Sequence, residues 1–277
     1  MSGAFLEQMA AASRARVQTA KQRVSEPALA AQARRTPAPP ALRLTAGSFD
    51  LIAELKLRSP AAGRLGAADE DAAGRAVVYA GAGAAAVSVL TEPQRFDGSL
   101  SHLRCAAQAL APLAVPAMRK DFLVDPYQVL EARAAGAGGV LVILRMLSRE
   151  TIGALLDCAR SHGLFVLLEA FDAQDLELMH ELAAAHAAST TLLAGVNCRD
   201  LTTLQVVPER LLELAPLLPA ALPRVAESGV AADADARRVA AAGYGLALVG
   251  SALMRAADPA ALARSLLAAG RAVRRAA

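Results

Sequence analysis

The chain has 277 residues, of which 55% are apolar and 20% charged, with a net charge of +3 and a mean hydropathy of +0.35. This composition excludes a disordered chain, and no apolar run approaches the ~20 residues that a membrane-spanning helix needs. Aromatic residues make up only 3% and the arginines are scattered, so a nucleic-acid-binding protein is disfavoured as well.

The cysteines and histidines indicate neither disulfides nor a metal site. Cys105, Cys158 and Cys198 are widely spaced and form no C-x-x-C pair, as is typical of reduced thiols in the cytoplasm. The four histidines show no metal-ligand spacing with one another or with a cysteine. We therefore expect a cytoplasmic protein without a metal ion and without nucleic-acid or membrane partners.

Residues 1–48 are expected to form a helix followed by a connector. The stretch "MSGAFLEQMAAASRARVQTAKQRV" is rich in Ala and Arg, as in a transit peptide, but it lacks the apolar core of a secretory signal. Phe5, Met9 and Val17 suit one apolar side of a helix, and "TPAPPAL" reads as a Pro-rich connector. Because this segment is too short for its own core, we expect it to pack on a catalytic domain spanning 49–277.

From residue 51 onward, short aliphatic runs alternate with helical stretches. The runs are 51–57, 84–90, 115–122, 138–144, 164–170, 192–198, 223–229 and 246–251. The helices between them have start signals at Asp125-Pro126, Ser148 and Asp258-Pro259, and several stop at glycine, as in "YAGAGA" and "SHGL". Eight such units predict an α/β fold, a single (β/α)8 TIM barrel with an extra N-terminal helical segment. An open doubly wound sheet is the alternative, although no G-x-G-x-x-G follows the first run.

The first run, "DLIAELKLRSP" at 50–60, places Glu54, Lys56 and Arg58 at every second position among aliphatic residues. In a barrel, one parity of each strand faces the helices and the other faces the interior or the mouth. Buried charges cost several kcal/mol, on the order of 3–5 when a partner is missing, so a strand that carries them indicates a functional site. We expect all three charged side chains to face inward or over the mouth.

Other predicted strands also end in polar or small residues. These are Lys120, Glu169, Asn197 with Arg199, Glu227 with Ser228 and Gly229, and Gly250 with Ser251. Because carboxyl ends of barrel strands meet at one face, the pattern predicts an active site there. The Ser and Gly residues predict a phosphate cradle, since small residues let backbone N–H groups approach an anion; tight turns are the alternative. We expect a lowered pKa for Lys120 beside another cation, and a raised pKa for Glu169 as a general base.

Several stretches resemble the indole-3-glycerol phosphate synthase family. They include "IAELKLRSPAAG" at 52–63, "RKDFLVDPYQVLEARAAGAGGVLVI" at 119–143, "GVNCRDL" at 195–201 and "VAESGV" at 225–230, and the resemblance covers nearly the whole chain. It implies the decarboxylating and dehydrating ring closure of 1-(2-carboxyphenylamino)-1-deoxyribulose 5-phosphate to indole-3-glycerol phosphate in tryptophan biosynthesis. It also implies a phosphorylated small-molecule substrate, no cofactor, and association with other tryptophan-pathway enzymes.

The resemblance further implies a role for each matching position. Lys120 would protonate the ribulosyl carbonyl oxygen, Glu169 would take or relay a proton, and Lys56 would assist dehydration, with the division of the acid role between the lysines left open. The binding roles would fall on Glu54, Asn197 and Glu227 for the amine and sugar hydroxyls, on Ser59 and Arg199 for charged substituents, on Ser228, Gly229, Gly250 and Ser251 for the phosphate, and on Phe96, Phe122 and Leu141 for the aromatic ring.

The chain departs from the family pattern at four positions. Leu57 stands where a second cation is usual, Arg95 where an aromatic residue is usual, Cys198 where Asn is frequent, and Phe171 where a polar residue is usual. Arg95 falls in the loop beside the expected ring pocket. It leaves open a paralogue that closes the same ring on a substituted anthranilate in secondary metabolism.

Two further alternatives are disfavoured by particular residues. A phosphoribosylanthranilate isomerase would need a cysteine near the end of the first strand, where Lys56 stands. A non-catalytic phosphate-binding barrel in a pathway complex would be expected to lose Lys120 or Glu169 first, and both are present.

Overall fold

The computed structural model describes residues 3–66, 70–201 and 203–276, and within them eight parallel strands close into a barrel. The strands, in barrel order, are β1 (Asp50–Leu55), β10 (Leu246–Val249), β9 (Arg224–Glu227), β8 (Leu192–Asn197), β7 (Phe165–Ala170), β6 (Gly139–Ile143), β5 (Ala117–Lys120) and β4 (Ala86–Leu90). Their ends differ from the predicted runs by no more than two residues. The predicted TIM barrel is confirmed, and the closure excludes the open doubly wound sheet.

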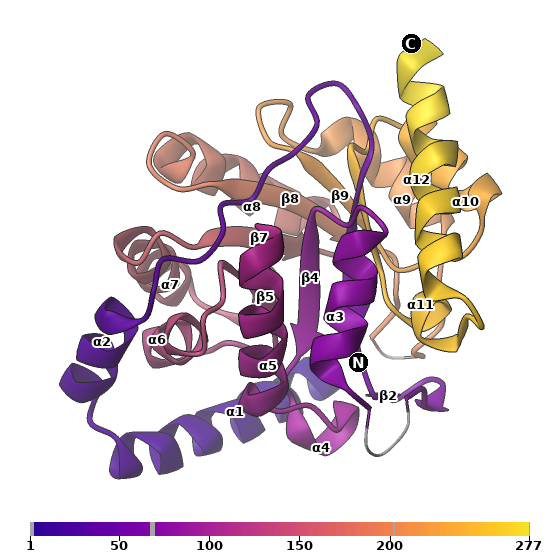
Figure 1. Cartoon of the computed structure of the whole chain (residues 1–277). Coiled ribbons are helices and arrows are strands. Elements are labelled where there is room, and N and C mark those ends of the chain that lie inside the picture. The colour runs from indigo at the N-terminus through magenta and orange to yellow at the C-terminus, as the bar shows by residue number, and fades with distance from the viewer. Residues whose placement is uncertain (1–2, 67–69, 202, 277) are drawn as a thin grey trace.

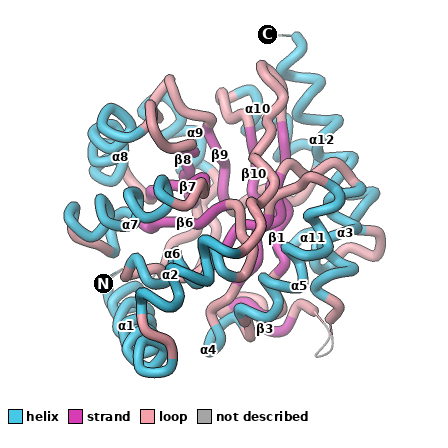
Figure 2. Tube along the Cα trace, turned by 60° about the vertical axis from the view of Figure 1, so that its left-hand side comes forward, coloured by secondary structure: helices cyan, strands magenta, loops and turns pink. Residues whose placement is uncertain are grey.

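Helices surround the barrel on its outer side (Figure 1, Figure 2). They are α3 (Ala72–Gly81), α4 (Pro93–Phe96), α5 (Leu100–Leu110), α6 (Pro126–Ala134), α7 (Arg149–Ser161), α8 (Ala173–His186), α9 (Glu209–Leu214), α10 (Asp233–Ala241), α11 (Ser251–Arg255) and α12 (Pro259–Ala276), with 3-10 turns η1 (Ala111–Leu113), η2 (Leu144–Met146) and η3 (Ala215–Leu217). The predicted start signals are confirmed, since Asp125 accepts from Tyr127 N–H and Ser148 from Thr151 N–H. Across the described helices, none is long and apolar enough to span a membrane.

The alternation along each strand divides the core into two layers. Leu51, Ala53 and Leu55 of β1 point outward and are buried against the surrounding helices, as predicted. Ile52, of the opposite parity, lies inside the barrel in a second apolar cluster that includes Phe165. Period-two patterning in a closed sheet therefore places Glu54 of β1 on the interior side.

The barrel interior is filled at the level of Gly139 and Phe165, which are register neighbours on β6 and β7. A Cβ added at Gly139 would lie 2.3 Å from Cζ of the Phe165 ring, so only glycine leaves room for that ring. Phe165 is 3% exposed. Close packing of this kind makes the lower barrel a solid core.

Two helices precede the barrel: α1 (Gly3–Arg23) and α2 (Glu26–Arg35). α1 lies across the end of the barrel where α4 is found (Figure 1), and Leu6 and Met9 join the interior apolar cluster. α2 packs on α6, with Leu29 buried beside Tyr127 and Leu130. The first helix thus covers the face at which the strands end.

One expectation for the first strand is wrong. After Leu55 the chain leaves the barrel and forms an antiparallel hairpin of β2 (Arg58–Ser59) and β3 (Gly63–Arg64). Arg58 is exposed there, and its Nη1 lies 3.8 Å from Asp97 Oδ1. The period-two pattern continues in the sequence beyond the end of the strand, and for that reason it misplaced Arg58.

Candidate active site

A cavity of about 400 Å³ opens where the barrel strands end. The residues predicted for the site all line it, namely Glu54, Lys56, Ser59, Phe96, Lys120, Phe122, Leu141, Glu169, Asn197, Arg199, Glu227, Ser228, Gly229, Gly250 and Ser251. The structure therefore brings together residues of six barrel strands, of the segments that follow the strands, and of α4. Their convergence follows from the parallel barrel, which directs all carboxyl ends to one face.

Lys120, the last residue of β5, lies among carboxylates. Its Nζ is 3.2 Å from Glu227 Oε2 and 3.7 Å from Glu169 Oε2. Burial by itself lowers the pKa of Lys120, but the negative charges of Glu169, Glu227 and Glu54 outweigh it and raise the pKa above its ordinary value. The expected lowering is wrong, because the neighbours of Lys120 are carboxylates rather than a second cation.

Lys56 and Glu54 form a second, separate ion pair in the cavity, with Nζ and Oε1 2.6 Å apart. Glu54 is 2% exposed, and a Cβ at Gly250 would lie 2.1 Å from its Oε1. The glycine after β10 is thus required for the position of this carboxylate as well as for an open strand end. Each lysine of the site has its own carboxylate partner.

Glu227 at the end of β9 is the most strongly perturbed acid of the cavity. Burial raises the pKa of Glu227 to about 8; Lys120 opposes this rise and Glu169 adds to it. Its Oε1 has no hydrogen-bond partner within the described part of the chain. That oxygen faces Gly195 of β8, where a Cβ would lie 2.4 Å away.

Asn197 connects the acids to the loop that follows β9. Its Nδ2 donates to Glu169 Oε1 at 2.5 Å, and its Oδ1 accepts from Ser228 Oγ and from Arg199 N–H, both at 2.9 Å. Ser228 has φ of 65° and Gly229 of 72°, so two successive left-handed residues turn the chain here. A non-glycine residue held at positive φ is costly and is found most often at functional sites.

The predicted phosphate-binding residues border the cavity on neighbouring strands. Ser228 and Gly229 follow β9, Gly250 and Ser251 follow β10, and these two strands are paired in the barrel. Arg238 of α10 and Arg255 of α11 also line the cavity and were not predicted. Both lie in the helices that follow the Ser-Gly and Gly-Ser turns, and that position is the signal that could have indicated them.

The apolar side of the cavity is built around Phe122. Its ring centroid is 6.2 Å from that of Phe96 and 6.0 Å from that of Phe5, the latter in an edge-on arrangement. Leu141 completes the predicted wall, and Phe5, from α1, was not predicted to contribute. Such aromatic groupings suit a planar, apolar ligand group.

Two positions that depart from the family pattern differ in their relation to the cavity. Phe171 lines it and lies under the guanidinium of Arg145, at 4.8 Å from the ring centroid. The cavity-lining residue of α4 is Phe96, whereas Arg95 donates its backbone N–H to Glu92 Oε2 at 2.7 Å. Arg95 thus lies beside the cavity, as expected, but is not among the described residues that line it.

No cluster of three or more His, Cys, Asp or Glu suited to a metal ion occurs among residues 3–66, 70–201 and 203–276. Near the strand ends the described site offers the ammonium groups of Lys56 and Lys120, the carboxyl groups of Glu54, Glu169 and Glu227, and the amide of Asn197, with arginines and an apolar wall farther along the lining. Paired acids and bases of this kind can move protons to and from a bound substrate.

Residues 6–266 match a family model described as "Indole-3-glycerol phosphate synthase". The chain is 43% identical over 227 residues to the indole-3-glycerol phosphate synthase of Parafrankia sp. (strain EAN1pec), covering 82% of this chain and 81% of that one. It is 41% identical over 236 residues to a "Multifunctional tryptophan biosynthesis protein" of Schizosaccharomyces pombe, covering 83% of this chain and 30% of that protein. Among solved structures, 3-hexulose-6-phosphate synthase from Salmonella typhimurium shares the fold, with a TM-score of 0.60 at 15% identity over 81% of this chain and 100% of that one.

Proposed function

The chain belongs to the indole-3-glycerol phosphate synthase family, whose members are enzymes of tryptophan biosynthesis, and we propose which residues of its cavity carry out each step of the family's reaction. The substrate, 1-(2-carboxyphenylamino)-1-deoxyribulose 5-phosphate, loses carbon dioxide and water as the indole ring closes. A proton must be given to the carbonyl oxygen, another must be given as water leaves, and one must be removed from the carbon beside the nitrogen.

The observation that carries the proposal is the position of Lys120 between Glu169 and Glu227 beside the aromatic wall. Lys120 donates a proton to the carbonyl oxygen as the ring carbon that bears the carboxylate attacks the carbonyl carbon. The carboxylate then leaves as carbon dioxide, and its bonding electrons restore the aromatic ring. The two carboxylates hold Lys120 in the cavity as the protonated ammonium before substrate binds.

Dehydration needs an acid and a base acting together. Lys56 lies in the same cavity with its own partner, Glu54, at 2.6 Å and supplies a proton to the departing hydroxyl. Glu169 removes the proton from the carbon beside the nitrogen, and the 2.5 Å hydrogen bond from Asn197 holds its carboxylate in place. This division gives each lysine one step.

The remaining residues hold the substrate at its two ends. Phe96, Phe122 and Leu141 pack on the anthranilate ring, and the Ser228–Gly229 and Gly250–Ser251 turns bind the phosphate. Between these ends, Glu54, Asn197 and Glu227 bind the amine and hydroxyls, while Ser59 and Arg199 orient the charged substituents. The distribution is supported by the cavity, which has an apolar side and a side of small turn residues.

We also propose that the enzyme works in the cytoplasm in association with other enzymes of tryptophan biosynthesis. The three cysteines are free thiols. The Schizosaccharomyces pombe relative is named as a multifunctional tryptophan biosynthesis protein, and this chain matches 30% of it. Co-purification with tagged pathway enzymes at physiological salt would test the association.

The absence of tryptophan from the chain gives a direct assay, because indole fluorescence can then come only from product. Mixing purified protein with substrate is expected to raise the indole emission. The rise is expected to disappear in Lys120→Met and in Glu169→Gln. A folded wild-type protein that gives no rise would overturn the proposed assignment of the cavity.

A further inference from the structure

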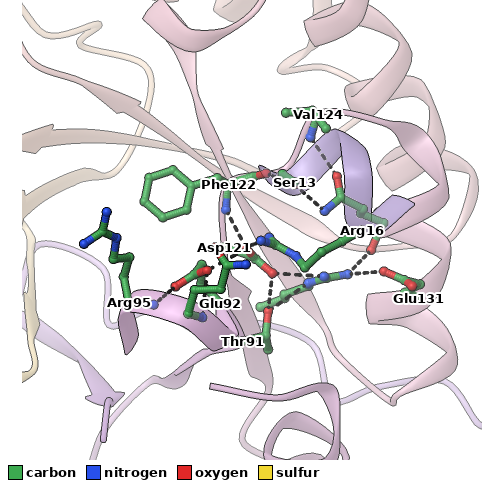
Figure 3. A network of polar contacts seen from close by, with 12 residues as sticks. Ser13, Arg16, Thr91, Glu92, Arg95, Asp121, Phe122, Val124 and Glu131 are labelled. Carbon is green, nitrogen blue, oxygen red and sulfur yellow. Dashed lines mark hydrogen bonds and ion pairs between the residues drawn. The ribbon is translucent and has the colours of Figure 1, made fainter. Parts of the chain in front are cut away.

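The polar part of α1 contacts the segment that follows β5. Ser13 and Arg16 are one helical turn apart and so lie on the same face of α1. Ser13 Oγ donates to the carbonyl oxygen of Phe122 at 2.6 Å and accepts from Gln128 Nε2 at 3.0 Å. Figure 3 shows Ser13 and Arg16 approaching this segment, which has no secondary structure of its own.

Asp121, the residue after Lys120, has both carboxylate oxygens fully engaged. Oδ1 accepts from Arg16 Nη2 at 2.8 Å and from the backbone N–H of Phe122 at 2.8 Å. Oδ2 accepts from Thr91 Oγ1 at 2.7 Å and from Arg119 Nη2 at 3.1 Å. Its side chain is 1% exposed, so these four contacts fix the backbone at the end of β5.

Glu92, the second partner of Arg16, sets the position of α4. Its two oxygens accept from the backbone N–H groups of Gln94 and Arg95 at 3.0 and 2.7 Å. Arg16 Nη1 lies 3.5 Å from Glu92 Oε1, and the Glu92 side chain is 0% exposed. One guanidinium therefore joins the cap of α4 to the residue after Lys120 (Figure 3).

We propose that Arg16 is a positioning residue for ring closure. Through Asp121 and Glu92 it fixes the position of Lys120 relative to the aromatic wall. The proposal rests on the function proposed above for Lys120. The two joined segments carry Lys120 and Phe122 on one side and Phe96 on the other, so Arg16 ties the proposed acid to the ring wall, in addition to the bond from Thr91 to Asp121.

Charge and geometry explain why arginine is needed. Without the guanidinium, two buried carboxylates lose a positive partner and repel each other, which drives the end of β5 away from α4. Lysine would retain the charge, but as a compact ammonium it lacks the planar fork that reaches two carboxylates at once. A displacement of Lys120 by a fraction of an ångström lowers the rate of the chemical step without removing any substrate contact.

The expected signature is a loss of kcat with little change in KM. The proposed phosphate-binding turns follow β9 and β10, whereas Arg16 acts on β5 and α4. Misplacing the acid thus leaves the phosphate contacts intact. A structural role alone would lower stability and change neither kinetic constant.

The test compares kcat, KM and melting temperature of Arg16→Gln and Arg16→Lys with those of Lys21→Gln. Lys21 is a matched control, because it belongs to the same helix and ties it to Asp125 at 2.8 Å, away from Asp121 and Glu92. Arg16→Gln is expected to lower kcat by about tenfold or more and to leave KM within about threefold. Arg16→Lys is expected to recover part of the loss, and Lys21→Gln to keep kcat within about twofold of wild type.

Equal losses of kcat in Arg16→Gln and Lys21→Gln would overturn the proposal, as would a wild-type kcat in folded Arg16→Gln. If circular dichroism shows that Arg16→Gln does not fold, Arg16→Lys decides: a wild-type kcat there overturns the proposal, and a reduced one supports it. Failure of the function proposed for Lys120 is recognised separately, because then Lys120→Met would keep the wild-type kcat.

Discussion

Nζ of Lys120 on β5 lies 3.2 Å from Oε2 of Glu227 on β9, although these strands are opposite each other in the barrel, with three strands between them on either side. The pair spans the mouth of the barrel. It links the β5 side, which carries the proposed acid and the aromatic wall, to the β9 side, which carries the proposed phosphate turn. Replacing either member of the pair is therefore expected to leave the other without a buried partner.

Replacement of Lys120 tests the acid role quantitatively. Lys120→Met removes the proposed proton donor and leaves Glu169 and Glu227 without their shared cation, and kcat is expected to fall by about 10²–10⁴-fold. Steady-state indole fluorescence measures the loss. Lys56→Met is the matched control, and it is expected to accumulate a ring-closed, undehydrated intermediate visible by mass spectrometry. An equal block of ring closure in both variants would contradict the proposed division.

Gly195→Ala is expected to displace Glu227. The new Cβ would lie 2.4 Å from Glu227 Oε1 and 2.9 Å from Leu167 Cδ1, so the carboxylate must leave the position in which it contacts Lys120. We expect a loss of about 1–3 kcal/mol in the free energy of unfolding and a lower kcat, measured by urea denaturation and by the fluorescence assay.

The same substitution at Gly153 is the control for that experiment. Gly153 lies inside α7 with nothing within 4 Å of an added Cβ, so Ala there is expected to stabilise the protein by about 0.5–1 kcal/mol. Unchanged kcat in Gly195→Ala would show that the position of Glu227 does not depend on this glycine.

The raised pKa of Glu227 predicts a pH-dependent contribution to stability. Burial raises the pKa from its ordinary value of 4.5 to about 8, so between these pH values the glutamate is ionised in the unfolded chain and protonated in the folded one. The stability that Glu227 contributes is present below the unfolded pKa and is lost as the pH rises through the folded one. From about pH 5 to about pH 9, wild type is expected to lose more free energy of unfolding than Glu227→Gln. If the free energy of unfolding, measured by urea denaturation, falls equally with pH in wild type and in Glu227→Gln, the prediction is wrong.

Arg95 is expected to have little influence on substrate binding. Among the described residues that line the cavity, α4 is represented by Phe96, and the backbone of Arg95 serves to cap that helix through Glu92. Arg95→Ala is therefore expected to keep KM within about twofold, whereas Phe96→Ala should raise it by about tenfold through lost stacking on the ring. A larger KM change at Arg95 than at Phe96 would restore the argument for a substituted substrate.

Much of the site was predictable because a barrel converts strand parity into position. Period-two alternation placed Glu54 and Lys56 on the interior side, and the parallel order brought Glu169, Asn197 and Glu227 to the same face. These are local patterns read strand by strand, and they need no knowledge of which side chains meet.

What the sequence could not indicate depends on contacts between distant segments. Lys120 and Glu227 are separated by 107 positions, and the approach of such distant carboxylates, Glu169 among them, reverses the expected direction of the pKa of Lys120. Arg58 was misplaced because the strand ends before its pattern does. The bond of Arg16 to Asp121 joins residues 105 positions apart, and an arginine on a polar helix carries no sign of such a partner.

The ring of Phe165 packed against Gly139 fills the barrel interior beneath the cavity. We therefore expect substrate to enter, and product to leave, at the face where the strands end. Molecules that enter or leave at this face pass α1, which contributes Phe5 and Leu6 to the lining of the cavity. When substrate and product use the same face of an enzyme, the release of product can limit kcat once the chemical steps are fast.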